Sequence, residues 1–68
     1  MENIFATRLK ELRKEKQLGQ VELAEKINVG KSIISLWENG QCEPTLSRLV
    51  ELALFFGVSI DYLVGLED

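Results

Sequence analysis

The sequence predicts an all-α fold of five helices, and three observations lead to this class. Apolar residues recur three and four positions apart along most of the chain, which is the period of an amphipathic helix. Gly, Pro and Asn divide these segments into short pieces. The one candidate strand, residues 58–60, is too short, and Asp61 breaks its alternation. The 68 residues are therefore expected to form a single domain, 1–68, near the lower size limit for a self-standing core.

The first two helices are expected on either side of Gly19. The first begins after Asn3, a favoured N-cap, and runs to about Lys16. Its inward stripe has the spacing i, i+4, i+7 and consists of Phe5, Leu9 and Leu12. The second covers residues 20–27, and its apolar set consists of Val21, Leu23, Ala24 and Ile27. Asn28 follows, a residue type that tolerates the left-handed conformation ending many helices.

The third helix is expected over residues 31–38, with Ile34 and Trp37 on its buried side. Asn39 and Gly40 form a stop signal, and a loop follows over residues 41–44.

The fourth and fifth helices fill the rest of the chain. Thr45 caps the fourth helix and Gly57 ends it; the side chains expected to point inward are Leu46, Leu49, Val50, Ala53 and Phe56. The fifth helix covers residues 60–64, after Ser59, and Gly65 closes it. Further apolar residues at this end are expected at the edge of the core or in a dimer interface, with Leu63 in the core itself: Leu54, Phe55, Tyr62, Leu63 and Leu66.

Composition narrows the function classes. Cys42 is the one cysteine and histidine is absent, so we expect no disulfide, no structural zinc site and no cofactor, in a reducing, cytoplasmic compartment. No apolar run approaches the ~20 residues of a membrane span. The sequence pairs no nucleophile with a base and has no Gly-rich phosphate loop, which argues against an enzyme. A helical globule of this size is also expected to leave no room for a drug-sized pocket or a small-molecule substrate.

Charge is unevenly distributed along the chain. The formal net charge is −3. Residues 1–31 carry seven basic and five acidic side chains, whereas residues 32–68 carry one basic and six acidic ones. One end of the domain is therefore suited to phosphate, although the overall charge opposes binding to nucleic acid.

The pair of short helices at 20–27 and 31–38 is the most informative feature. They are joined by the tight turn Asn28-Val29-Gly30, and Val29 is placed to fill the angle between them. Two helices held in this way let the second project its outer face into a DNA major groove, which is about 12 Å wide.

Five segments together resemble the Cro/C1-type (XRE-like) helix-turn-helix family, over about residues 4–65. They are Leu9-Lys10-Glu11-Leu12-Arg13, Gln20-Val21-Glu22-Leu23-Ala24, Ile34-Ser35-Leu36-Trp37-Glu38-Asn39-Gly40, Glu43-Pro44-Thr45-Leu46 and Gly57-Val58-Ser59-Ile60-Asp61-Tyr62-Leu63. The resemblance implies a five-helix, lambda-repressor-like domain with its helix-turn-helix motif at about residues 20–38. It also implies a transcriptional regulator, expected to be a repressor, that binds a roughly palindromic double-stranded DNA operator as a homodimer.

The resemblance further assigns roles to individual residues. The residues expected to contact bases are Lys31, Ser32, Ile33 and Leu36. Those expected to contact phosphate are Gln20, Ser35, Asn39 and Gln41. Arg13 and Glu38 match a pair that forms a structural salt bridge in relatives. Because serine and leucine read bases ambiguously, these residues predict a recognition face and not an operator sequence.

The sequence also departs from the family pattern. Gly19 and Gly30 stand where Ser or Thr usually cap the motif helices, Leu36 replaces a polar residue, and residues 41–43 replace a loop often rich in cations. These departures support a second hypothesis of a different class. In it the domain is a protein-interaction module, antitoxin- or antirepressor-like, with weak or no DNA binding, and Leu36 and Ile33 contact a protein.

Overall fold

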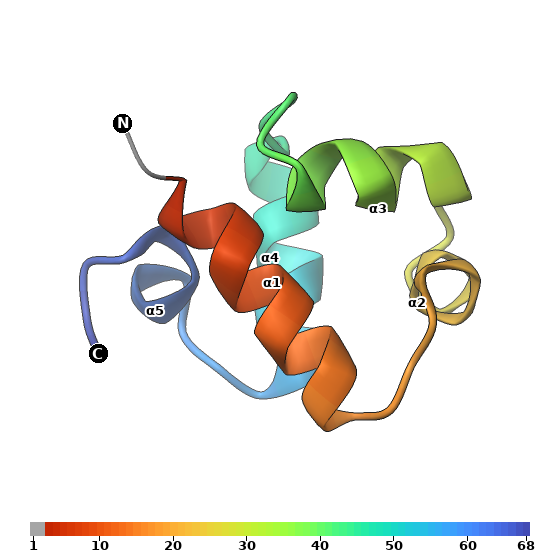
Figure 1. The fold of residues 1–68 in the computed structure, drawn as a ribbon. Helices are drawn as coiled ribbons and strands as arrows, with labels where there is room; N and C mark the ends of the chain where they lie inside the picture. Colours follow the sequence, from red (N-terminus) through yellow and green to blue (C-terminus); the bar gives the residue numbers. More distant parts are fainter. Residues whose placement is uncertain (1–2) are drawn as a thin grey trace.

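The computed structural model describes residues 3–68, and within them it contains five α-helices and no β-strand (Figure 1). The helices are α1 (Ile4–Glu15), α2 (Gln20–Lys26), α3 (Lys31–Glu38), α4 (Leu46–Phe56) and α5 (Ile60–Val64). The all-α class is confirmed, and each helix begins and ends within one residue of its predicted bounds. None of the helices in the described part of the chain is both long and apolar enough to cross a membrane.

Polar caps and left-handed glycines set half of the helix ends. The side-chain oxygens of Asn3, Thr45 and Ser59 each accept a hydrogen bond from the N–H three residues later, at 3.0, 3.3 and 2.9 Å. Each cap satisfies a donor that a helix N-terminus leaves free. Gly57 and Gly65 end α4 and α5 with φ of 69° and 90°, a conformation that costs glycine little.

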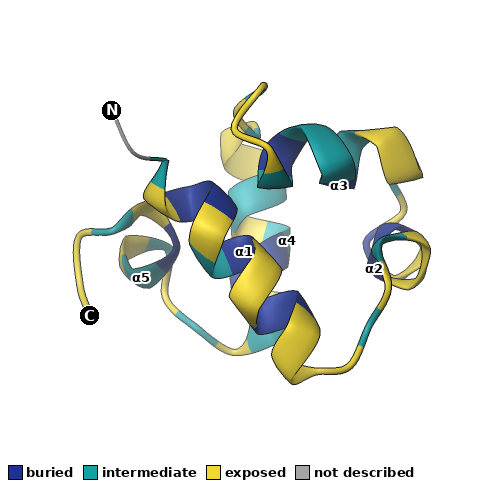
Figure 2. Ribbon diagram, viewed as in Figure 1, coloured by how far each residue is buried: buried dark blue, intermediate teal, exposed yellow. Residues whose placement is uncertain are grey.

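All five helices share one core, which lies between α1 and α4 and extends beneath α3 (Figure 2). Each helix contributes one large side chain with no exposed surface, and these are Leu9, Leu23, Ile34, Leu52 and Leu63. The predicted inward residues Phe5, Leu12 and Trp37 are buried as well. No helix therefore packs as a separate unit, and α2 and α3 are positioned by the whole domain.

The predicted inward face of α4 was partly wrong. Leu46 and Val50 are 70% and 40% exposed, whereas Leu52, which was not predicted to point inward, is completely buried. The helix is apolar on most sides, so its period fits two neighbouring stripes equally well. Packing against the other helices selects the stripe that contains Leu52 and Ala53. Val21 of α2 is likewise 50% exposed, although it belongs to the predicted apolar set.

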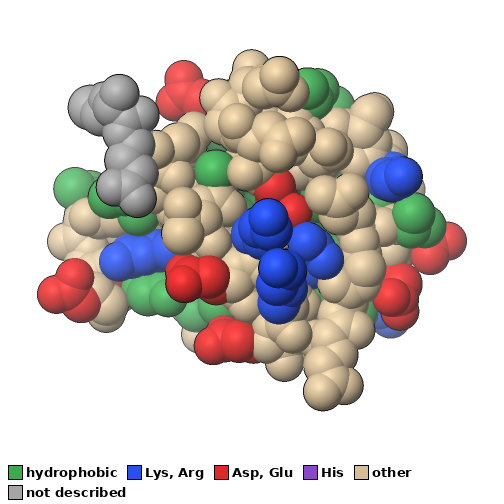
Figure 3. Space-filling model, in the orientation of Figure 1, with side chains coloured by type: hydrophobic (Ala, Val, Ile, Leu, Met, Phe, Trp, Pro, Cys, Tyr) green, Lys and Arg blue, Asp and Glu red, His purple; other side chains and the backbone are tan. Residues whose placement is uncertain are grey.

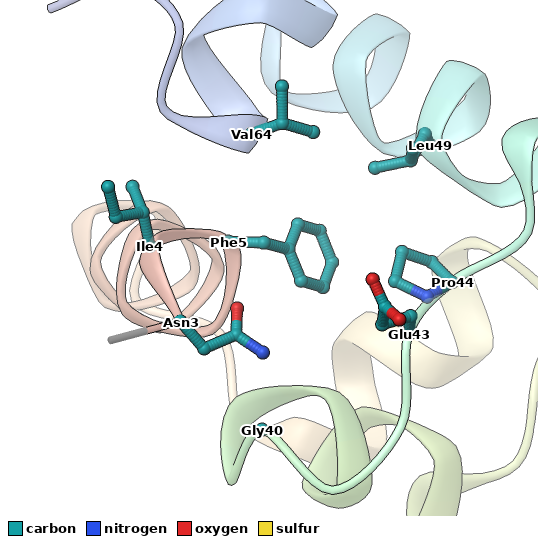
Figure 4. A pocket seen from close by; sticks show the side chains of 8 residues that line it. All are labelled: Asn3, Ile4, Phe5, Gly40, Glu43, Pro44, Leu49 and Val64. Carbon is teal, nitrogen blue, oxygen red and sulfur yellow. The ribbon is translucent and has the colours of Figure 1, made fainter. Parts of the chain in front are cut away.

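An open groove of about 600 Å³ lies where α1, α4, α5 and the loop after α3 meet. The Phe5 ring points into it, with Leu49 and Val64 across from the ring and Glu43 beside Pro44 at one edge (Figure 4). This volume lies within the usual range for ligand pockets, roughly 300–1,000 Å³. Such pockets enclose most of their ligand, however, whereas this groove is open to solvent, so the expectation that the domain leaves no room for one stays a prediction.

Candidate nucleic-acid interface

The turn between α2 and α3 is fixed by its backbone. Asn28 adopts the left-handed conformation predicted for it, with φ of 59°. The N–H of Val29 donates to the carbonyl of Ala24 at 2.9 Å, and the Val29 side chain packs against the core. α3 then begins directly after Gly30. The angle between the two helices is thus set by a hydrogen-bonded turn with an apolar side chain beneath it.

The two faces of α3 have different environments. Ile34 and Trp37 face the core and are 0% and 3% exposed. Lys31 and Ser32 are exposed at the start of the helix, and Leu36 is half-buried one turn further along the outer face. Of the four residues predicted to contact bases, Ile33 is the exception, because its side chain packs partly against the core. Ile33 therefore lies at the boundary between the buried face and the outer face of α3.

The C-terminal end of α3 gathers three residues predicted to contact phosphate. The Asn39 side-chain amide donates to the Ser35 hydroxyl at 3.4 Å. The backbone N–H of Gln41 donates to the carbonyl of Leu36 at 2.9 Å. Gly40, just before Gln41, adopts the left-handed conformation with φ of 70°. This turn holds Ser35, Asn39 and Gln41 together at one end of the outer face of α3.

The carboxylate of Glu38 connects three helices. It accepts two hydrogen bonds from the Arg13 guanidinium, at 2.6 Å from Nε and 3.0 Å from Nη2. It accepts a third from the Gln20 amide at 3.2 Å. Arg13 also donates from Nη1 to the carbonyl of Leu18 at 2.9 Å. The structure thus joins α1, α2 and α3 at one carboxylate.

The Arg13–Glu38 ion pair is mostly shielded from water, because the two side chains are 11% and 3% exposed. The hydrogen bond to Glu38 raises the pKa of Arg13 above its ordinary value; burial opposes this rise and the charge of Glu38 adds to it. Arg13 therefore remains cationic over the whole pH range in which proteins fold. The Gln20 contact was missed by sequence reasoning, which placed Gln20 only against phosphate.

The N-termini of α2 and α3 begin at glycines, which provide no side-chain acceptor. At α2 the Glu22 carboxylate instead accepts the N–H of Gly19 at 2.9 Å. Basic side chains lie nearby on α1. Figure 3 shows that Lys and Arg side chains gather at the centre of this face, over α1 and next to α3. These cations lie next to α3 although the domain is acidic overall, with a formal net charge of −3.

Comparison with known proteins gives a consistent result. Residues 9–63 match a family model described as helix-turn-helix. The chain is 42% identical over 65 residues to the uncharacterized HTH-type transcriptional regulator YobD of Bacillus subtilis, covering 96% of this chain and 58% of YobD. It is 40% identical over 60 residues to the immunity repressor protein of Bacillus phage phi105, covering 88% of this chain and 42% of the repressor. The chain thus spans about half the length of these relatives.

Solved structures resemble the whole domain. The crystal structure of a transcriptional regulator from Listeria innocua superposes with a TM-score of 0.89 at 34% identity, covering 100% of this chain and 64% of the regulator. A crystal structure of FeII HppE in complex with substrate superposes with a TM-score of 0.82 at 32% identity, covering 91% of this chain and 33% of that protein. The same five-helix unit therefore also occurs as a minor part of longer chains.

Proposed function

This chain belongs to the Cro/C1-type helix-turn-helix family of transcriptional regulators, and from that membership we propose that it represses transcription by binding operator DNA in the cytoplasm. One observation carries the proposal. The outer face of α3 offers Lys31, Ser32 and Leu36 on a helix whose angle is fixed by the turn before it. The single carboxylate between residues 31 and 41, that of Glu38, is bound by Arg13 and does not oppose phosphate from that face.

In the proposed complex α3 enters the major groove. Lys31 reaches guanine at the N-terminal end of the helix, Ser32 bonds a base edge, and Leu36 packs on a thymine methyl group. Ile33 contacts the edge of the same groove. Phosphate contacts by Gln20, Ser35, Asn39 and Gln41 set the register of the helix on the duplex, while the base contacts provide specificity.

The proposed operator is a rough palindrome because the domain acts as a homodimer. Support for dimerisation comes from apolar side chains that remain exposed at the end of the domain formed by α4 and α5. Leu54 and Leu66 are 78% and 77% exposed, and Leu46 and Val50 extend the same side of α4 at a spacing of four. An exposed apolar surface of this kind usually marks an interface. Two-fold pairing places the half-sites about one helical turn apart.

Selection of bound duplexes from a random pool tests the proposal, followed by measurement of the affinity of the winning sequence against salt. We expect a palindrome with half-sites one turn apart, and an affinity that falls as salt rises. Enrichment of no sequence, together with equal affinity for random duplexes, would contradict sequence-specific binding.

A protein-interaction module is the second candidate, and the exposed apolar residues together with the net charge of −3 favour it. In that case Leu36 and Ile33 contact a protein partner. Leu36→Ala and Ile33→Ala would then abolish a protein complex recovered with the wild-type chain, and would leave any residual DNA binding unchanged. A complex that survives both substitutions would argue against this candidate.

A further inference from the structure

All three arginines of this acidic domain already interact with other groups of the protein. Arg8 donates to the carbonyl of Glu67 at 2.6 Å and lies 4.2 Å from the centre of the Tyr62 ring. Arg48 forms an ion pair with Glu51 at 2.9 Å. Arg13 is bound by Glu38, as described above. The positive charge available for the proposed DNA backbone must therefore come from lysines.

Two lysines of α1 lie beside the helix-turn-helix. Lys10 and Lys14 stand three residues before and one residue after Arg13, so the three side chains occupy one strip of the helix surface. The contacts of Arg13 show that this strip faces α2 and α3, because its side chain reaches Glu38 of α3 and the carbonyl of Leu18 just before α2. Lys10 and Lys14 are exposed, and the basic cluster over α1 in Figure 3 lies on this side of the domain.

These two lysines also repel one another. Like charges at a spacing of four destabilise a helix by a few tenths of a kcal/mol. Among residues 3–68 the ion pairs within 4.0 Å involve only Arg13 and Arg48, so no carboxylate holds Lys10 or Lys14 at close range. The dipole of α1 favours a cation in its last turn, which accounts for Lys14. It does not account for Lys10, which lies in the middle of the helix.

We propose that Lys10 and Lys14 bind the DNA backbone at phosphates next to the one contacted by Gln20. This inference rests on the proposed function and extends its phosphate-binding surface from α2 onto α1. The Glu38 carboxylate connects the two parts, because it binds Arg13, which lies on the same side of α1 as the two lysines, and also binds the Gln20 amide. An amide NH2 group has two donors, so Gln20 keeps one for phosphate while the other bonds Glu38. The lysines of α1 thereby replace the cations missing from residues 41–43.

The test compares two double variants with the same change in charge. Lys10→Gln/Lys14→Gln removes the proposed contacts. Lys16→Gln/Lys26→Gln is the control, because the Lys16 amine lies 5.6 Å from the Phe55 ring centre on another side of α1, and Lys26 is at the opposite end of α2 from Gln20. Affinity is measured against salt for the duplex that the wild-type chain selects, or for a random-sequence duplex if none is enriched. Urea unfolding of each variant verifies the fold.

Each phosphate contact contributes about 0.9 to the slope of log K against log salt. Lys10→Gln/Lys14→Gln is therefore expected to reduce the slope by about 1.8 and the affinity by roughly 30-fold at physiological salt. The control is expected to leave the slope nearly unchanged. Equal effects of the two double variants would show that the lysines act only through the overall field, which overturns the contact proposal while DNA binding stands. A wild-type chain that binds no duplex even at low salt would overturn the proposed function and this inference with it.

Discussion

Substitution of Arg13 by alanine is expected to destabilise the domain severely, because the guanidinium holds a carboxylate that water barely reaches. The substitution removes both hydrogen bonds to Glu38, at 2.6 and 3.0 Å, and the bond to the Leu18 carbonyl at 2.9 Å. The Glu38 side chain is 3% exposed and would retain only the Gln20 amide at 3.2 Å. A nearly buried negative charge would then lack its counter-charge.

The expected cost follows from this geometry. Removal of one partner of a fully buried ion pair costs about 3–5 kcal/mol. The Arg13 side chain is 11% exposed, so water entering at its place recovers part of that loss. We expect Arg13→Ala to lower the free energy of unfolding by about 2–4 kcal/mol. A domain of this length has a total of only about 3–10 kcal/mol, so the variant is expected to be partly unfolded near 37 °C.

Urea unfolding followed by tryptophan fluorescence measures this effect, because Trp37 is the one tryptophan and is 3% exposed. The matched variant is Arg13→Met/Glu38→Leu, which removes both charges and keeps apolar volume. It is expected to lose less than about 1.5 kcal/mol, since isosteric apolar pairs often replace buried ion pairs without loss. With Arg13→Met and Glu38→Leu alone, the set completes a double-mutant cycle.

The loss of stability of Arg13→Ala, compared with that of the double variant, tests whether the unpaired charge of Glu38 causes the destabilisation. If Arg13→Ala costs less than about 0.5 kcal/mol, the pair behaves as a solvated surface bridge and the burial argument fails. If the double variant loses as much as Arg13→Ala, although it keeps apolar volume and leaves no unpaired charge, the lost hydrogen bonds to the Leu18 carbonyl and from the Gln20 amide cause the destabilisation, and the unpaired charge of Glu38 does not.

Three further predictions follow from the structure. Lys31→Ala is expected to weaken operator affinity at least several-fold in a binding titration while the melting temperature stays within a degree or two; a melted domain with unchanged binding would show that the recognition face is misassigned. Leu52→Ala is expected to cost about 2–5 kcal/mol in urea unfolding and Leu46→Ala less than about 0.5 kcal/mol, so similar losses would contradict the observed face of α4. Gly65→Ala is expected to lower thermal stability more than Gly57→Ala, because a Cβ at Gly65 would lie 2.9 Å from an isoleucine side chain whereas nothing lies within 4 Å at Gly57; the reverse order in calorimetry would refute this.

Features that depend on neighbouring residues were predicted well from the sequence. The caps at Asn3, Thr45 and Ser59 and the stops at Gly57 and Gly65 act within a few positions, so their residue types alone indicate them. The turn at Asn28 follows for the same reason.

Features that depend on distant packing were not predictable in this way. The period of α4 permits two inward stripes, and only the position of the other helices selects the one with Leu52. The bond from Gln20 to Glu38 joins residues 18 positions apart, and no local pattern indicates it. The groove beside Phe5 is lined by residues that are far apart in the sequence, from Asn3 to Val64. The roles of α3 side chains toward bases remain predictions.

The shared core makes the fold of α3 depend on temperature together with the rest of the domain. Because each helix contributes one fully buried side chain, the core provides no basis for α3 to separate from the others while the rest stays folded. If the domain represses transcription, operator occupancy would follow the folded fraction and be lost in a single thermal step. Cavity-forming substitutions at Leu63, on the helix last in the chain, would then yield regulators that repress at low temperature and release their operator when warmed, without altering any residue that faces DNA.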